Sequence, residues 1–123
     1  MSTPVPTRFE PPGKGQIVCR LSDLPDNDAV GFSFRDGERV RKILIVRRGQ
    51  ELRCYRNVCP HAGVPLDWVP NKFLNRARTH IHCQAHGALF EIDDGYCVEG
   101  PCAGDSLMRL AVAVEGDEVR LLE

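Results

Sequence analysis

Four side chains with the chemistry of metal ligands occur in two short stretches of the chain. The first stretch, NVCPHAGVPLDW, holds Cys59 and His61 with one residue between them. The second stretch, CQAHGALF, holds Cys83 and His86 with two residues between them. We call these stretches the first and second Cys/His boxes. Thiolates and imidazoles bind transition metals, so the two boxes together predict a site with four protein ligands.

The spacing of the ligands favours a cluster of two irons over a single zinc ion. Zinc fingers usually place two like ligands in one knuckle, whereas each box here holds one ligand of each kind. A C-x-H step is also short for two ligands of one tetrahedral ion. A two-iron cluster fits better, because each box can send its cysteine to one iron and its histidine to the other. A zinc-stabilised interaction module is the less favoured alternative.

The chain before the first box predicts an antiparallel meander. Residues 31–48, GFSFRDGERVRKILIVRR, form two strand-like runs joined by an Asp36-Gly37 turn, and ELRCYRN follows after a Gly49-Gln50 turn. In ELRCYRN, Leu52 and Cys54 alternate with Arg53 and Tyr55, a pattern typical of a half-buried strand. We therefore expect Cys54 to face the core and its neighbours to face outward.

The remaining elements predict an all-β domain with the two boxes inserted into it. SLMRLAVAV and EVRLL flank the turn residues EGD and predict a second hairpin. Residues 57–105 are rich in Gly, Pro, Cys and His and form the inserted part. Only VPNKFLNRAR, between the boxes, has the character of one or two helical turns.

Composition limits what the chain can do. Its 123 residues and 13.7 kDa correspond to one domain, which we place at residues 16–123. Residues 1–15 hold four prolines and no apolar run, which predicts an extended, mobile tail rather than an export signal. The net charge of −1 disfavours nucleic acid and membrane surfaces as partners. We expect a cytoplasmic monomer whose thiols stay reduced.

The two boxes resemble the cluster-binding boxes of Rieske [2Fe-2S] proteins. CPHAG and CQAHGALF carry the resemblance, and GPC at 100–102 is similar to the short proline loop that closes over the cluster in that family. The resemblance implies one [2Fe-2S] cluster, with Cys59 and Cys83 on the inner iron and His61 and His86 on the outer iron. It also implies an antiparallel β scaffold, sandwich- or barrel-like, that carries a cluster-binding subdomain at about residues 57–105.

Four positions depart from the high-potential members of this family. Val64 and Ala85 stand where those proteins have a disulfide, and Ala88 and Phe90 stand where they have hydroxyl donors. Hydrogen bonds to sulfur stabilise the reduced state, so their loss lowers the reduction potential. We predict a potential of roughly −150 mV, at the bottom of the Rieske range. Backbone N–H groups are expected to supply the remaining donors, near Ala62, Gly63, Gly87 and Ala88.

The cysteines and histidines outside the four-ligand set have simpler interpretations. Cys19 and Cys54 are expected to be buried small side chains. Cys97 and Cys102 flank the Gly100-Pro101 turn and are expected to be thiols rather than a disulfide. His80 and His82 lie two apart on a predicted strand and so share one face, which we expect to be solvated. Packing is the expected role of Trp68, Phe73 and Leu74, which lie between the boxes.

The resemblance implies a ferredoxin-like electron carrier, passing single electrons from a flavin-containing reductase to a terminal oxygenase. Complete oxygenase activity is not expected, because only His80 and His82 remain for a mononuclear iron site once the cluster has its ligands. We therefore expect no enzymatic activity of its own. The alternative is a non-catalytic subunit or redox-sensing module of a larger complex, such as a nitrite reductase.

Overall fold

The computed structural model of the chain describes residues 7–8, 16–36, 38–60, 63–67, 69–84 and 87–122. In these ranges the regular structure is β-strand apart from a short 3-10 helix, η1 (Leu21–Asp23). The strands are β1 (Thr7–Arg8), β2 (Gln16–Arg20), β3 (Asp28–Asp36), β4 (Arg39–Arg48), β5 (Glu51–Arg56), β6 (His80–His82), β7 (Leu89–Glu91), β8 (Cys97–Glu99), β9 (Arg109–Leu110), β10 (Val112–Glu115) and β11 (Glu118–Leu121). The prediction of an all-β fold is confirmed.

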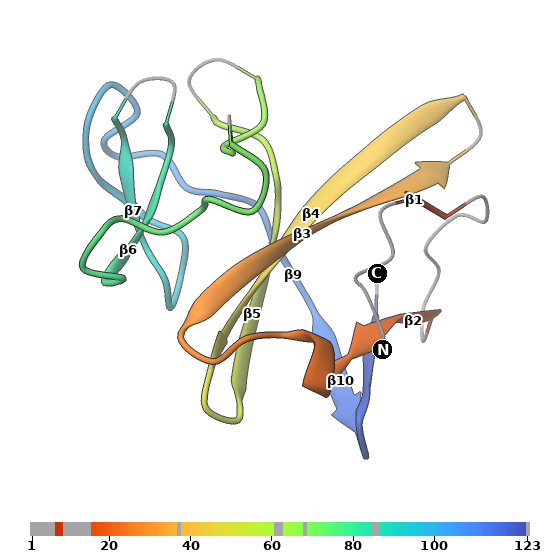
Figure 1. Ribbon diagram of the computed structural model, residues 1–123. Coiled ribbons are helices and arrows are strands. Elements are labelled where there is room, and N and C mark those ends of the chain that lie inside the picture. The colour runs from red at the N-terminus through yellow and green to blue at the C-terminus, as the bar shows by residue number, and fades with distance from the viewer. Residues whose placement is uncertain are drawn as a thin grey trace.

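The strands are arranged in three sheets (Figure 1). The central sheet has the order β1-β3-β4-β5-β9, the terminal sheet the order β10-β11-β2, and the box sheet the order β6-β7-β8. Neighbouring strands are antiparallel, with one exception: β1 pairs with β3 in parallel. Of the tail expected at residues 1–15, the structure describes only the two residues of β1, and the others lie outside the described residues.

The predicted meander is present in the central sheet. β3 pairs with β4 over its whole length, from Asp28 opposite Arg47 to Asp36 opposite Arg39. β5 follows β4 directly and pairs with it from Ile43–Arg56 to Arg48–Glu51. The turn between them uses Gly49 at a φ of +63°, a conformation that glycine adopts without a steric penalty. The Gly49-Gln50 turn was therefore correctly predicted, whereas the predicted Asp36-Gly37 turn includes Gly37, which lies outside the described residues.

Two hydrophobic cores lie on opposite faces of the central sheet. The scaffold core contains Val18, Cys19, Leu24, Val30, Phe32, Phe34, Ile43, Ile45, Cys54, Leu110, Val119 and Leu121. The box core contains Ala29, Leu44, Val46, Tyr55, Cys59, Leu66, Phe73, Ile81, Cys83, Ala88, Phe90, Ile92, Cys97, Cys102 and Leu107. Since side chains alternate along a strand, β4 contributes Ile43 and Ile45 to the scaffold core and Leu44 and Val46 to the box core.

The half-buried pattern predicted for β5 is only partly right. Cys54 faces the scaffold core and is fully buried, as expected. Tyr55 is also fully buried, although the alternation placed it on the solvent side. The reason is that the inserted part covers the second face of the sheet. The Tyr55 hydroxyl donates a hydrogen bond to the Ile92 carbonyl, 2.5 Å away, and so joins β5 to the loop after β7.

The box sheet and its loops form the inserted part of the fold. The first Cys/His box follows β5, and the second forms the connection from β6 to β7. Residues 69–78 do not form the helical turns suggested by their sequence. Asn71 and Arg78 have φ values of +64° and +59°, which do not occur within a right-handed helix. The segment instead makes two tight turns, closed by Lys72 N–H to the Val69 carbonyl and by Arg78 N–H to the Asn75 carbonyl.

The chain returns to the scaffold after β8. β9 pairs with the outer edge of β5, and the predicted hairpin follows as β10 and β11. β11 then pairs with β2, so that the terminal sheet packs against the scaffold core. Within the described part of the chain, no helix has the length and apolar character needed to cross a membrane.

Candidate metal centre

The two Cys/His boxes have the same backbone hydrogen-bond pattern around their cysteines. Cys59 N–H donates to the Val64 carbonyl, and Gly63 N–H donates back to the Cys59 carbonyl, each over 2.8 Å. In the second box, Cys83 N–H donates to the carbonyl five residues later and receives a bond from Gly87 N–H, again over 2.8 Å. Each box is therefore a tight loop of one design, closed immediately beside its cysteine.

The turn glycines of the two loops have nearly the same conformation. Gly63 has a φ of +70° and Gly87 a φ of +73°, in the left-handed region that favours glycine. Both N–H groups are used within their own loops, as donors to Cys59 and Cys83 carbonyls. These two N–H groups therefore close the turns, and the expectation that backbone N–H groups near Ala62, Gly63, Gly87 and Ala88 donate toward the cluster stays a prediction.

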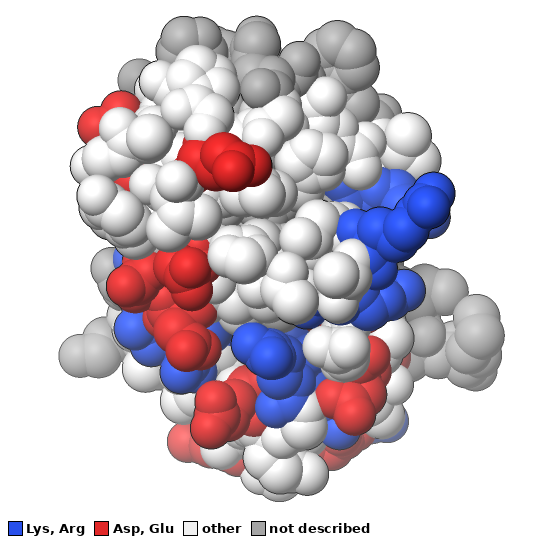
Figure 2. Space-filling view, turned by 90° about the vertical axis from the view of Figure 1, so that its left-hand side faces the viewer, with Lys and Arg blue, Asp and Glu red and all other residues white. Residues whose placement is uncertain are grey.

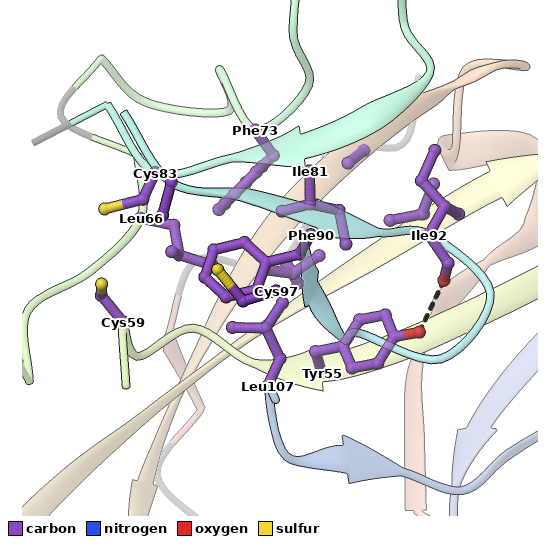
Figure 3. Packing of buried hydrophobic residues seen from close by; sticks show 14 of the residues in the cluster. Tyr55, Cys59, Leu66, Phe73, Ile81, Cys83, Phe90, Ile92, Cys97 and Leu107 are labelled. Atoms are coloured by element: carbon purple, nitrogen blue, oxygen red, sulfur yellow. Dashed lines mark hydrogen bonds between the residues drawn. The ribbon is translucent and has the colours of Figure 1, made fainter. Parts of the chain in front are cut away.

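Both cysteine side chains are fully buried at the edge of the box core. Cys59 and Cys83 each have 0% of their surface exposed. In Figure 3 their sulfur atoms lie at the same end of the core, beyond Leu66 and Phe90. His61 and His86, the other two predicted ligands, lie outside the described residues, as do Ala62, Trp68 and Ala85. The structure thus describes the two thiols of the predicted ligand set and not the two imidazoles.

The predicted proline loop packs directly on the second box. Gly100 has a φ of +103°, and a Cβ placed on it would lie 2.7 Å from the Ala88 Cα. Because a Cβ cannot approach a backbone atom that closely, no side chain fits at position 100 in this conformation. The loop is closed by a bond from Ala103 N–H to the Gly100 carbonyl, and it is tied to β8 of the box sheet by a bond from Gly104 N–H to the Cys97 carbonyl.

The positions that lack hydroxyl donors are buried beside the cysteines. Ala88 and Phe90 are both 0% exposed, so water does not replace the missing hydroxyls there. Val64 is partly buried and packs against the box core. The side chains around the two thiols are therefore mainly apolar.

Two further thiols lie in the same core. Cys97 and Cys102 are buried and are thiols rather than halves of a disulfide, as predicted, with their sulfur atoms 3.3 Å apart. The pKa of Cys102 is raised to about 12, mainly by burial and also by its contact with the Cys97 thiol. Cys19, in the scaffold core, also has its pKa raised to about 12 by burial.

Sequence reasoning missed the polar side chain that fixes the first box. Asn57 is 4% exposed; its Oδ1 accepts from Leu66 N–H at 2.7 Å, and its Nδ2 donates to Asp67 at 2.9 Å. Asp67 in turn accepts from Asn71 N–H, and Asn71 accepts from Gly31 N–H in β3. This relay joins both ends of the box to the central sheet. The available signal was an asparagine at the start of the box, two residues before Cys59.

His80 and His82 lie on β6 as predicted and are both partly buried. His80 Nε2 lies 3.3 Å from a carboxylate oxygen of Glu91 on the neighbouring strand, and its Nδ1 lies 2.9 Å from the Thr79 hydroxyl. His80 is therefore held by its neighbours at the strand surface. Among the described residues, which omit His61 and His86, no group of three or more His, Cys, Asp or Glu side chains could hold a metal ion.

The donor set and its surroundings fit a [2Fe-2S] cluster. Two thiols are presented by matching loops at one end of a core, and each loop continues directly into the segment that contains its histidine. An iron–sulfur cluster is held by cysteine thiolates, and its surroundings tune it; these loops present two buried thiols among mainly apolar side chains.

Comparison with known proteins gives the same result. The model of the Rieske [2Fe-2S] domain matches residues 14–114. The ferredoxin of carbazole 1,9a-dioxygenase from Nocardioides aromaticivorans IC177 superposes with a TM-score of 0.69 at 22% identity, over 89% of this chain and 97% of that one. The Sphingomonas yanoikuyae B1 ferredoxin gives 0.69 at 20% identity, over 89% and 99%.

Some larger proteins contain the fold of this chain as one part of their own structure. The terminal oxygenase of carbazole 1,9a-dioxygenase from Novosphingobium sp. KA1 has a TM-score of 0.72 at 20% identity, over 89% of this chain but 30% of that one. No curated protein matches the chain significantly in sequence.

The fold, the paired loops and the family match together place this chain in one class: it belongs to the Rieske [2Fe-2S] domain family. Its cofactor is accordingly a Rieske-type [2Fe-2S] cluster.

Proposed function

We propose that this protein is a Rieske-type ferredoxin, a carrier that accepts one electron from a flavin-containing reductase and passes it to a terminal oxygenase. The observation that carries the proposal is the pair of matching loops, which present Cys59 and Cys83 at one end of a single Rieske domain. The likeness in fold to two solved ferredoxins, which the chain covers to 97% and 99%, supports the same function.

We further propose that Cys59, His61, Cys83 and His86 hold the cluster, with the cysteines on the buried iron and the histidines on the outer one. When bound, the cluster supplies a site that takes up and releases one electron, as one ferric ion becomes ferrous. Two thiolates and two neutral imidazoles leave the oxidised centre uncharged, so adding an electron costs less than with four thiolates. The buried thiols keep the inner side of the site dry, which leaves the histidine side for electron exchange.

The surface agrees with a small carrier that meets its partners transiently. On the face shown in Figure 2, the end that carries the boxes displays mainly uncharged side chains, while acidic and basic side chains are interspersed further down. Such a mixture gives no strong field of one sign, and transient electron-transfer complexes bury small interfaces. We propose that the protein is a monomer with no substrate site of its own.

The experiment that tests the carrier function follows one electron. The cluster-loaded protein is reduced chemically and mixed in a stopped-flow spectrometer with the oxidised terminal oxygenase of a carbazole 1,9a-dioxygenase. We expect uptake of one electron per chain and its transfer to the oxygenase, with sedimentation showing a monomer throughout. A protein that aggregates alone, or that transfers no electron to such an oxygenase, would instead indicate a permanent subunit of another complex.

Replacing His86 by Cys tests the ligand assignment. The ligand set then gains one formal negative charge, so we expect a loaded cluster with a more negative midpoint potential. His82→Cys is the matched control, because His82 is a histidine of the same region outside the proposed set. A midpoint that is unchanged in His86→Cys would contradict the assignment of His86.

A further inference from the structure

The backbone of Leu66, inside the first Cys/His box, is hydrogen-bonded both to the start of its own box and to the second box. Leu66 N–H donates to Oδ1 of Asn57 over 2.7 Å, and the Leu66 carbonyl accepts from Gln84 N–H over 3.2 Å. Asn57 lies two residues before Cys59, and Gln84 directly follows Cys83. Two successive hydrogen bonds therefore connect the chain beside one cysteine with the chain beside the other.

The Asn57 side chain is itself held on the scaffold. Its backbone N–H donates to the Lys42 carbonyl of β4 over 2.8 Å, and its Nδ2 donates to Asp67 Oδ1 over 2.9 Å. An amide side chain can accept and donate at the same time, whereas a carboxylate only accepts and an aliphatic side chain does neither. Asn57 therefore has the chemistry to hold Leu66 and Asp67 together and to fix both to β4.

Burial makes the bond between Asn57 and Leu66 difficult to replace. Leu66 has 0% of its surface exposed and Asn57 only 4%. In Figure 3, Leu66 lies at the end of the box core where the sulfur atoms of Cys59 and Cys83 are found. Removing the Asn57 amide would leave the Leu66 N–H without its acceptor in a place that water does not reach, which costs more than the loss of an exposed bond.

We propose that Asn57 is a positioning residue that fixes the separation of the Cys59 and Cys83 thiols and thereby determines how firmly the protein retains its cluster. This inference rests on the proposed function, because it requires both cysteines to be ligands. A cluster of fixed size needs its ligands at a fixed separation. Asn57 reaches Cys59 through two residues of chain and Cys83 through Leu66 and Gln84. Groups that orient a ligand without touching the metal typically change metal affinity by about 10- to 100-fold.

The first experiment measures how fast the cluster-loaded protein releases iron to a chelator. We expect Asn57→Ala to release iron roughly 10 to 100 times faster than the unmodified protein. Asn75→Ala is the matched control and should release iron at close to the unmodified rate. Asn75 also accepts from backbone N–H groups, those of Thr79 and His80, and donates to the Thr79 hydroxyl, so its side chain holds the turn before β6. Urea unfolding shows whether a general loss of stability explains either rate.

Exchanging two side chains tests whether the hydrogen bonds, rather than packing, are responsible. Asn57→Asp keeps the size of the side chain but places a carboxylate against Asp67, so release should be at least as fast as in Asn57→Ala. Adding Asp67→Asn restores a complete set of partners. The carboxylate at position 57 then accepts from Leu66 N–H and from the new amide, whose oxygen still accepts from Asn71 N–H. We expect this double variant to recover most of the lost retention.

A second measurement uses the unmodified, cluster-loaded protein and does not depend on how any variant folds. If Asn57 holds Leu66 and Leu66 holds the second box, one opening motion exposes the amides of both Leu66 and Gln84. Amide hydrogen exchange should therefore give these two amides high and equal protection factors. The Arg78 amide, which closes an exposed turn by donating to the Asn75 carbonyl, should be protected less.

The possible outcomes decide the role of Asn57 separately from the proposed function. Release from Asn57→Ala no faster than from Asn75→Ala, a double variant no better than Asn57→Asp, or different protection factors at Leu66 and Gln84 would overturn that role. Failure of Asn57→Ala to load a cluster that Asn75→Ala does load would support it. No oxygenase takes part, so a protein that transfers no electron would overturn only the proposed function. An unmodified chain that binds no [2Fe-2S] cluster would overturn both proposals.

Discussion

Cys59 and Cys83 occupy equivalent positions in two loops with the same hydrogen-bond pattern, and both are fully buried. We therefore expect the two residues to be equally sensitive to substitution. Cys59→Ser and Cys83→Ser should each lose nearly all bound iron and visible absorbance, because a serine oxygen is a poor substitute for a thiolate ligand. Cys19→Ala, with its buried thiol in the other core, should keep both. Iron and sulfide analysis of the purified variants, with their absorption spectra, gives the measurement.

The apolar surroundings of the two thiols predict a low potential. Ala88 and Phe90 are fully buried and carry no hydroxyl, so a cluster at this site lacks two donors to sulfur. We expect a midpoint of roughly −150 mV for the unmodified protein. Potentiometric titration followed by paramagnetic resonance measures it, and a clearly positive midpoint would contradict this account.

At the residue scale, the sequence was informative where chemistry is local. The burial of Cys19 and Cys54 and the thiol state of Cys97 and Cys102 were predicted from their settings in the sequence. The use of the Gly63 and Gly87 N–H groups within their own turns was not predicted, because it depends on how each loop closes. Asn57 was missed because its partners Leu66, Asp67 and the Asn71 relay are brought together only by the fold.

At the scale of elements, the contact between the proline loop and the second box is the tightest constraint near the site. Gly100→Ala should strain a left-handed residue and also push its Cβ against the Ala88 backbone, 2.7 Å away. Gly104 has a similar φ of +98° with open space around it, so Gly104→Ala measures the strain alone. We expect Gly104→Ala to cost about 1–2 kcal/mol of unfolding free energy and Gly100→Ala clearly more. Urea unfolding compares the two, and equal costs would contradict the close contact.

Tyr55 links β5 to the loop after β7. Its raised pKa makes the free energy of unfolding depend on pH in the alkaline range. Burial raises the pKa of Tyr55 to about 12, above its ordinary value of 10, with smaller opposing effects from nearby arginines. The neutral Tyr55 hydroxyl makes its full contribution to the free energy of unfolding below pH 10, where Tyr55 is protonated in both the folded and the unfolded forms. Between pH 10 and 12 the unfolded form ionises first, so the free energy of unfolding falls by up to about 1.4 kcal/mol per pH unit.

Tyr55→Phe tests this dependence. Below pH 9 the variant should be less stable by about 1–2 kcal/mol, because the buried Ile92 carbonyl loses its donor. Above pH 10 the difference should shrink, since the unmodified protein loses stability more steeply than the variant. Denaturant unfolding at several pH values gives both slopes. Parallel slopes would show that the Tyr55 hydroxyl ionises with the same pKa in both states.

The elements themselves were predictable where the pattern was regular. The hairpin before the boxes and the hairpin after them were predicted from alternating runs and Gly-containing turns. The tight turns of residues 69–78 were not predicted, because the left-handed conformations of Asn71 and Arg78 are set by turn geometry rather than by composition. Tyr55 was placed on the wrong side because alternation along one strand cannot show that a distant insertion covers its second face.

At the scale of the whole molecule, the two cores differ in their dependence on metal. Cys59 and Cys83, the two proposed ligands that the structure describes, both belong to the box core and not to the scaffold core. Removing the cluster with a chelator under reducing conditions should therefore loosen the boxes while the scaffold core persists. Amide hydrogen exchange should accelerate at Cys59, Gly63, Cys83 and Gly87 and stay slow in β11. Equal acceleration throughout would mean that the whole domain unfolds with its cluster.

Because β4 lies between the two cores, its adjacent side chains report separately on the packing of each core. Leu44 and Ile45 are neighbours in the chain and both fully buried, yet one packs beneath the boxes and the other within the scaffold. Shortening the side chain at Leu44 and at Ile45 in separate variants therefore probes two different cores from adjacent positions. Loosening that starts at the metal site should affect the packing of Leu44 first, and a loss of packing at Ile45 would show that the scaffold core has also begun to unfold.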